Sequence, residues 1–288
     1  MQPLREMEIG LMFWGEDDPL ASLRELKSLG LRCGHLGVAG GISLEGAAEK
    51  WKTALDQEQF SVTSVVASFN GESYADIPTV QKTVGYIPQG TRKEREERTY
   101  KLIDFAAALG APSYCCHAGH VPEDFSGPLY PPVRDIVRRI CDYAARQDVL
   151  FVLETGQESP QVLEDFIKDV DRPNLKVNFD PANIILYGVC DPIDALSQLA
   201  PWVASVHCKD GIWPPKDKPG SLGTEKRLGD GQVGIDRFIA KLKEIGYTGP
   251  LTIEREVAAA SQEDRHVAGL PHREDVQAAI SLLERLRD

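Results

Sequence analysis

The chain has 288 residues, a formal net charge of −12 and a sequence pI near 5.1. This acidic balance argues against a partner held mainly by phosphate neutralisation, because nucleic-acid binders usually present a basic face. No run approaches the roughly 18 apolar residues of a membrane span, and the first residues are too polar for a secretory signal, so we expect a cytoplasmic protein with no nucleic-acid or membrane partner.

Short β-rich segments alternate along the chain with segments whose apolar residues have helical spacing. In the first helical segment, Leu20, Leu23 and Leu26 recur at that spacing, and Gly30 stands where a C-cap glycine ends a helix. We expect strands at residues 9–14, 32–38, 62–69, 113–117, 151–154, 174–180, 203–207 and 251–254. We expect helices at about residues 19–29, 43–57 with Ser43 as N-cap, 92–109, 131–147, 160–170, 192–199, 235–245 and from 273 onward.

Eight strand–helix units in succession predict a parallel sheet whose strands are joined by helical crossovers. Eight units close into a (β/α)8 TIM barrel more naturally than they form an open sheet, and no Gly-rich nucleotide fingerprint follows the first strand. We therefore predict one α/β barrel domain over residues 1–288. Its six cysteines show no CxxC spacing, which favours packed thiols in a reducing compartment over disulfides or a zinc–thiolate site.

Four successive predicted strands end in side chains that can bind a metal ion: Glu154, Asp180, His207 and Glu254. Taken singly, each could be a salt-bridged or helix-capping polar group. Together they converge only if the strands are parallel neighbours, as in a barrel, where the chemistry lies at the carboxyl ends of the strands. Such a mixed oxygen and nitrogen set suits Mn²⁺, Mg²⁺, Co²⁺ or Zn²⁺, and we expect Mn²⁺.

A divalent ion that chelates two adjacent sugar oxygens polarises a carbonyl and acidifies the neighbouring C–H, as aldose–ketose isomerisation and epimerisation require. Glu154 and Glu254 are the candidate catalytic pair, one removing a proton from one face of the substrate and the other returning it to the opposite face. His207 and Asp180 would mainly hold the metal.

Five motifs together resemble one family, the xylose isomerase-like TIM barrels or sugar phosphate isomerase/epimerase superfamily, over nearly the whole chain. It includes ketose 3-epimerases, inosose dehydratases, hydroxypyruvate isomerases and abasic-site endonucleases. The motifs are Leu153-Glu154-Thr155, Asn178-Phe179-Asp180-Pro181-Ala182-Asn183, Val206-His207-Cys208-Lys209-Asp210, Leu228-Gly229-Asp230-Gly231 and Ile253-Glu254. The resemblance implies that Glu154, Asp180, His207 and Glu254 are the metal ligands, with the two glutamates also catalytic.

The resemblance further suggests Asn183 and Lys209 as contacts for substrate hydroxyls, and a substrate or metal role for His117. Asn183 could instead be a cap, and Lys209 the partner of Asp210. His120, in the loop after the fourth strand, could line the site or be a polar contact at the barrel rim. Trp14 and Asn70 are candidate sugar-binding groups at the ends of strands one and three, although a rim aromatic can be simple packing. His35 stays undecided.

Residues 211–233 form a long Gly/Pro/Lys-rich loop after the seventh strand. Loops of this length in compact domains are usually functional or disordered. We interpret it as a candidate lid, with Trp213, Lys216 and Arg227 available to close on a polyol or anionic substrate. The alternative is a plain flexible surface loop.

We expect a metal-dependent sugar isomerase or 3-epimerase that acts on a small carbohydrate. The alternative is a lyase on the same scaffold, such as an inosose dehydratase or an enzyme that cleaves 3-keto-glycosides. An abasic-site endonuclease is a remote alternative, because those enzymes carry a histidine where this chain has Asn183. A metal-free binding subunit is disfavoured by the four ligands. The sequence shows no obvious Gly-rich phosphate cradle at the ends of the seventh and eighth strands, which favours an unphosphorylated substrate. The protein could form a homo-oligomer.

Overall fold

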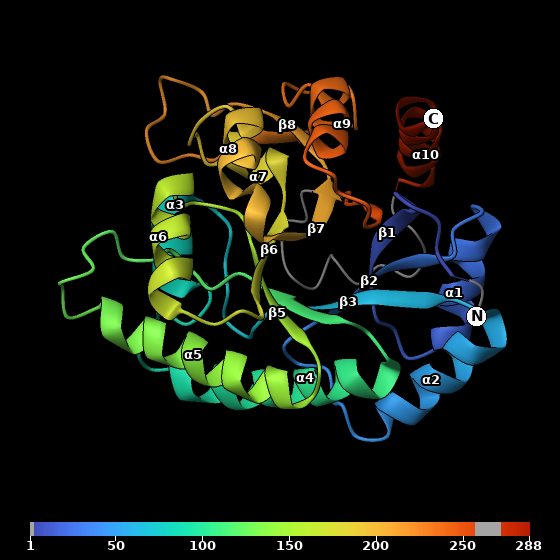
Figure 1. The fold of residues 1–288 in the computed structure, drawn as a ribbon, viewed down its shortest axis with the longest axis horizontal. Helices are drawn as coiled ribbons and strands as arrows, with labels where there is room; N and C mark the ends of the chain where they lie inside the picture. Colours follow the sequence, from blue (N-terminus) through green and yellow to red (C-terminus); the bar gives the residue numbers. More distant parts are fainter. Residues whose placement is uncertain (1–2, 257–271) are drawn as a thin grey trace.

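The computed structural model describes residues 3–256 and 272–288 of the chain. Eight parallel strands close into a barrel in the order β1-β10-β7-β6-β5-β4-β3-β2 (Figure 1). They are β1 (Ile9–Trp14), β2 (Cys33–Val38), β3 (Ser61–Ala67), β4 (Ser113–Cys116), β5 (Leu150–Glu154), β6 (Leu175–Phe179), β7 (Val203–Cys208) and β10 (Leu251–Ile253). The predicted TIM barrel is confirmed.

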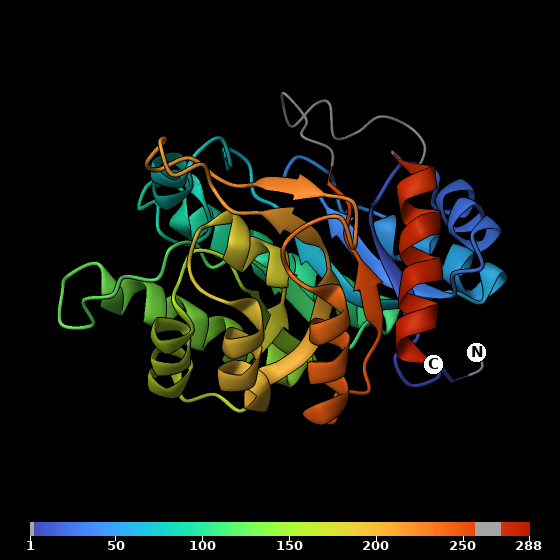
Figure 2. The same cartoon turned by 90° about the horizontal axis from the view of Figure 1, so that it is seen from above.

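Helices surround the barrel, and α10 packs beside β1 and β10 (Figures 1 and 2). They are α1 (Pro19–Ser28), α2 (Ala47–Glu58), α3 (Ile77–Thr83), α4 (Arg92–Leu109), α5 (Tyr130–Arg146), α6 (Pro160–Val170), α7 (Pro181–Leu186), α8 (Pro192–Leu199), α9 (Ile235–Glu244) and α10 (Arg273–Arg287). A 3-10 turn, η1 (Ala200–Trp202), precedes β7. None of the helices in residues 3–256 and 272–288 is both long and apolar enough to span a bilayer.

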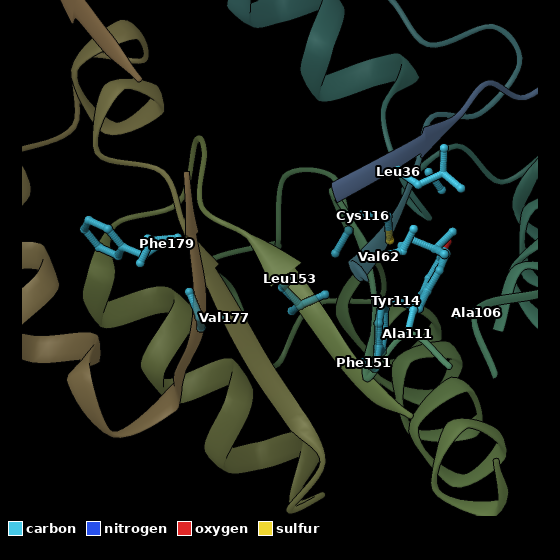
Figure 3. Close-up of a cluster of buried hydrophobic side chains, with 14 of the residues drawn as sticks. Leu36, Val62, Ala106, Ala111, Tyr114, Cys116, Phe151, Leu153, Val177 and Phe179 are labelled. Atoms are coloured by element: carbon cyan, nitrogen blue, oxygen red, sulfur yellow. The ribbon is translucent and has the colours of Figure 1, made fainter. Parts of the chain in front are cut away.

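The alternation of side chains along each strand separates the outer core from the barrel interior. On β5, Phe151 and Leu153 point outward into the large hydrophobic cluster between sheet and helices, part of which Figure 3 shows. Val152 lies instead in a small separate cluster with Val66 and Cys115. Because successive side chains of a strand face opposite sides, Glu154 shares the inward face with Val152.

Two predicted boundaries differ from the structure by two residues or more. The third strand ends at Ala67 and not at Phe69, whose N–H donates to the carboxylate of Glu72 in the following turn. Ser43 is not the N-cap of α2, because its hydroxyl accepts from the N–H of Glu45 in a local turn and the helix begins only at Ala47. Serine side chains satisfy such turns as readily as helix ends. The short helices α3 and α7 were not predicted.

The predicted long loop after β7 contains a hairpin, with β8 (Asp210–Ile212) antiparallel to β9 (Thr224–Lys226). Its tip contacts α3, where the N–H of Ile77 donates to the carbonyl of Gly220 at 3.0 Å. In the barrel order, β3, which precedes α3, lies diametrically opposite β7. Figure 2 shows this orange loop meeting the teal α3 region. The loop after β7 and the segment after β3 therefore meet at the carboxyl end of the barrel.

The carboxylate of Asp210 fastens the base of this loop. It accepts the backbone N–H groups of Gly211, Gly229, Gly231 and Val233 at 2.9 to 3.1 Å. A side chain at Gly231 would meet the Asp210 carboxylate at 2.1 Å, so the approach of backbone to carboxylate needs glycine at that position. Asp210 is therefore a loop anchor and not the ion-pair partner of Lys209.

We expect Asp210→Ala to lower the free energy of unfolding by about 3 kcal/mol, because it leaves buried N–H donors without an acceptor. The loop should open first, so limited proteolysis should cut within residues 213–228 faster than in the wild type. Asp217→Ala is the matched control, because Asp217 is an exposed carboxylate in the same loop. Equal cleavage rates for Asp210→Ala and Asp217→Ala would contradict this role.

Candidate metal centre

Four metal-capable side chains meet at the carboxyl ends of four neighbouring strands. Glu154 ends β5, Asp180 follows β6, His207 lies in β7 and Glu254 follows β10. Each continues the inward-facing alternation of its strand, next to outward residues such as Phe179 that lie in the outer core. All four side chains are buried, and one ligand atom from each lies within 4.8 Å of the others. The structure thus brings together the four residues that the sequence singled out.

The imidazole of His207 faces the three carboxylates through Nδ1. This atom is 3.1 Å from Glu154 Oε1, 3.2 Å from Glu254 Oε2 and 3.9 Å from Asp180 Oδ2. Two ligands that bind one ion at about 2.1 Å lie about 3 to 4 Å apart. These spacings therefore fit a single divalent ion on the Nδ1 side of the ring.

Asp180 supplies the clearest sign of a cation-binding site. Its Oδ1 caps α7 by accepting the N–H groups of Ala182 and Asn183. Its Oδ2 is buried and has no hydrogen-bond partner, and the Lys209 ammonium is 3.7 Å away. Burial raises the pKa of Asp180 well above its usual range, although Lys209 opposes the shift. A buried carboxylate oxygen without a partner is costly, so the donor set fits a divalent cation.

The cluster balances its own charge when no metal is bound. Burial disfavours protonation of His207, but Glu254 and Glu154 outweigh it and raise its pKa well above the usual range. Burial likewise disfavours the ionised form of Glu254, yet His207 and Lys209 hold its pKa well below the usual range. Because a histidine must be deprotonated to bind a metal, a divalent ion would take the place of the proton on His207.

Asn183 and Lys209, both predicted to contact substrate, lie directly against the ligands. Asn183 Nδ2 donates to Glu154 Oε1 at 3.3 Å and is not a cap, since Asp180 caps α7. Lys209 Nζ donates to Glu254 Oε2 at 3.0 Å and to Glu256 Oε2 at 2.9 Å. Both side chains are buried, so they hold the two glutamates in place whether or not they also contact a substrate.

His117, a predicted site residue just after β4, faces the carboxylate oxygen of Glu154 that His207 does not contact. His117 Nε2 is 3.7 Å from Glu154 Oε2, and both residues line one small cavity that also includes Glu158. Burial of the Glu154 carboxyl raises its pKa, but His117 and His207 outweigh this and lower it. Within the described residues, Nδ1 of His120 is buried without a hydrogen-bond partner.

The other predicted substrate groups have no described contact with the four ligands. Trp14 lies on the inward face of β1 with its ring packed on Gly37, where an added Cβ would come within 2.7 Å of the indole. Asn70 accepts from Arg95 through its carbonyl and lines a different cavity with Arg98. Arg227 is half exposed and forms an ion pair with Asp275 at 3.1 Å. Their binding of substrate stays a prediction.

Sequence reasoning missed the role of His35, whose Nδ1 lies 3.0 Å from His207 Nε2. It sits in the middle of β2 and not at a strand end, so the search for polar strand ends passed over it. The alternation of β2 does place it inward, because its neighbour Leu36 belongs to the outer core. Sequence reasoning also missed Glu256, whose carboxylate accepts a hydrogen bond from Lys209. It stands two residues after Glu254, the spacing at which side chains of an extended segment face the same side.

Comparisons with known proteins agree with this architecture. The family model described as xylose isomerase-like TIM barrel matches residues 23–286. The crystal structure of a xylose isomerase domain protein from Planctomyces limnophilus is 37% identical, covers 98% of this chain and 97% of that chain, and superimposes with a TM-score of 0.85. D-Psicose 3-epimerase from Clostridium cellulolyticum H10, solved with D-tagatose, shares the fold at 17% identity, covering 98% of this chain and 100% of that chain with a TM-score of 0.71.

One curated relative is a 3-dehydroshikimate dehydratase from Bacillus anthracis. It is 37% identical over 169 residues, which cover 54% of this chain and 56% of the relative. The chain therefore spans little more than half the length of this relative.

Proposed function

Because this chain belongs to the xylose isomerase-like TIM barrel family, we propose that it is a divalent-metal-dependent enzyme that transfers a proton at the carbon next to a carbonyl. We place isomerisation or epimerisation of a ketose or related polyol first. The observation that carries the proposal is the buried set of four residues with ligand atoms within 4.8 Å of one another, of which Asp180 has an Oδ2 without a hydrogen-bond partner. Neighbours in the family include an epimerase and a dehydratase.

Glu154, Asp180, His207 and Glu254 would hold the ion, for which Mn²⁺ is our first choice and Mg²⁺, Co²⁺ and Zn²⁺ are alternatives. When bound, such an ion polarises the substrate carbonyl and acidifies the adjacent C–H. Asp180 is fixed in place by its cap of α7, and His207 by its contacts on both ring nitrogens.

Glu154 and Glu254 are the proposed acid/base pair. Both are held ionised in the metal-free protein, because His117 and His207 lower the pKa of Glu154 and His207 and Lys209 lower that of Glu254, each against the effect of burial. The described contacts of the Glu254 carboxylate all use Oε2. Oε1 is therefore the atom available to accept a substrate proton. In an isomerisation the carboxyl formed would return this proton to the neighbouring carbon, whereas in an epimerisation Glu154 would have to carry a proton and deliver it to the opposite face.

The second candidate is a lyase that begins with the same deprotonation. The electron pair of the broken C–H bond then forms a double bond and expels a leaving group at the β carbon, which departs with the bonding electrons. The dehydratase named among the relatives favours this reaction. Two classes of substrate fit such an elimination: inososes, which would lose water, and 3-keto-glycosides, which would lose the aglycone.

The products distinguish isomerisation or epimerisation from elimination. Metal-loaded protein in D₂O would be incubated with ketoses, inososes, 3-keto-glycosides and 3-dehydroshikimate, and followed by NMR and mass spectrometry. Deuterium at the carbon next to the carbonyl in a product of otherwise conserved mass supports isomerisation or epimerisation, whereas loss of water or of an aglycone supports elimination. No metal-dependent exchange or elimination with any compound of the panel would overturn the proposed chemistry.

We expect Lys209→Met to destabilise the metal-free protein by about 3 to 5 kcal/mol, because it removes the cation from buried carboxylates. Bound metal should restore part of this loss, since its charge compensates Glu254 and Asp180. Lys216→Met, an exposed substitution in the loop after β7, is the control. Denaturant unfolding with and without metal measures both effects, and equal stability of the two variants without metal would contradict the charge-balancing role of Lys209.

A further inference from the structure

A pair of histidines connects the candidate metal centre to β2, three strands away from β7 around the barrel. His35 in β2 and His207 in β7 are separated in the sheet by β1 and β10, so they meet across the barrel interior. His35 Nδ1 is 3.0 Å from His207 Nε2, and the ring centroids are 5.1 Å apart at 52°. Both side chains are almost completely buried. This contact has no role in the acid/base chemistry proposed above.

The positions of the three carboxylates indicate which ring nitrogen of each histidine carries a proton in the hydrogen bond between His35 and His207. Nδ1 of His207 faces Glu154, Glu254 and Asp180, so this is the nitrogen that must present a lone pair to a metal ion. The remaining proton of the neutral ring must then sit on Nε2, which points at His35. His35 Nδ1 can complete the hydrogen bond only as an acceptor, so its own proton lies on Nε2.

We propose that His35 is a positioning residue of the metal centre, a neutral acceptor that fixes the tautomer and ring orientation of His207. The inference rests on the proposed metal site. Outer partners of metal-bound histidines are most often carboxylates or backbone carbonyls, and they set ligand orientation and affinity. Here a neutral imidazole takes that place, so no further negative charge is added beside three buried carboxylates.

The surroundings of His35 are consistent with a neutral ring. Burial lowers the pKa of His35 well below its usual range, and the nearby positive charge of His207 lowers it further. The same hydrogen bond can form whether the His207 ring carries one proton or two, because Nε2, which faces His35 Nδ1, holds a proton in both forms. His35 therefore needs no change of protonation when the metal binds.

The backbone of β2 holds His35 in a fixed place. An added Cβ at the preceding residue, Gly34, would lie 2.2 Å from the carbonyl oxygen of Leu11, so β1 and β2 approach closely there. An added Cβ at Gly37 would meet the ring of Trp14. With Gly34 directly before it and Gly37 two residues after it, the strand presents His35 as the polar group of its inward face, within reach of β7.

The test compares His35→Asn, whose Oδ1 can replace the Nδ1 acceptor, with His35→Leu, which fills similar space without an acceptor. Titration calorimetry with Mn²⁺ gives the affinity, and circular dichroism checks the fold. His35→Leu should bind Mn²⁺ about 10 to 100-fold more weakly than the wild type, as for other outer partners of metal ligands. His35→Asn should recover most of that loss, a rescue that a purely packing role would not produce.

A second readout uses the unaltered protein. In ¹⁵N-histidine-labelled protein loaded with diamagnetic Mg²⁺ or Zn²⁺, NMR should find His35 neutral with its proton on Nε2. Equal Mn²⁺ affinity of wild type and His35→Leu, or a proton on Nδ1 of metal-loaded His35, would overturn the positioning role while leaving the proposed function intact. A wild type that binds no divalent ion would overturn both.

Discussion

Replacing Glu254 with glutamine should lower the rate of metal-dependent proton exchange about 10³-fold, because the variant cannot accept the substrate proton. The amide keeps an oxygen for the metal and the size of the side chain, so metal should still bind when it is supplied in excess. The rate is measured by deuterium incorporation at saturating Mn²⁺, with the best substrate of the panel, so that weakened metal binding does not limit it.

Glu244→Gln is the matched control for this experiment, because Glu244 is an exposed residue at the end of α9 that pairs with Lys241. It should exchange at the wild-type rate. If Glu254→Gln at saturating metal also exchanged within a few-fold of the wild type, Glu254 would not be the base, and Glu154 would have to act alone.

Asp180→Asn should abolish high-affinity metal binding while leaving the metal-free protein at least as stable as the wild type. The asparagine Oδ1 can still cap α7, but an amide replaces the unpartnered carboxylate oxygen. Burial raises the pKa of Asp180 above its unfolded value, so ionising this group opposes folding as pH rises, and the neutral amide removes that cost at neutral pH. We expect metal affinity to fall at least about 100-fold.

Thermal unfolding measures both parts of this prediction. A metal present at about 100 times its Kd stabilises the wild type by about 2.7 kcal/mol, and at the same concentration the variant should gain almost nothing. Glu45→Gln, an exposed substitution between β2 and α2, should keep the full gain. Metal-dependent stabilisation of Asp180→Asn equal to that of the wild type would show that Asp180 is not a ligand.

Much of the fold and of the candidate centre could be predicted because both depend on local patterns. Each of the four candidate ligands stands at or near the end of an apolar strand, and parallel strands bring such ends to one face. The ends of the predicted strands were therefore sufficient to identify the four candidate ligands, Glu154, Asp180, His207 and Glu254. The glycines that end α1 and α4 were also readable, since Gly30 and Gly110 both adopt positive φ.

What could not be predicted depends on contacts between distant segments. His35 meets His207 over 172 residues of sequence, and only the closed barrel brings them together. The same holds for the loop after β7, whose contact with Ile77 fixes where its tip lies. Arg227 was predicted as a lid cation, but its partner Asp275 lies in α10, which no local pattern connects to that loop.

The most direct test is anomalous diffraction from crystals of the protein grown with Mn²⁺. The account predicts one anomalous peak at the carboxyl end of the barrel, bound by Glu154, Asp180, Glu254 and Nδ1 of His207, with His207 Nε2 turned to His35. A peak bound through Nε2, a peak only at surface carboxylates, or no peak from crystals in which Mn²⁺ is saturating would contradict it.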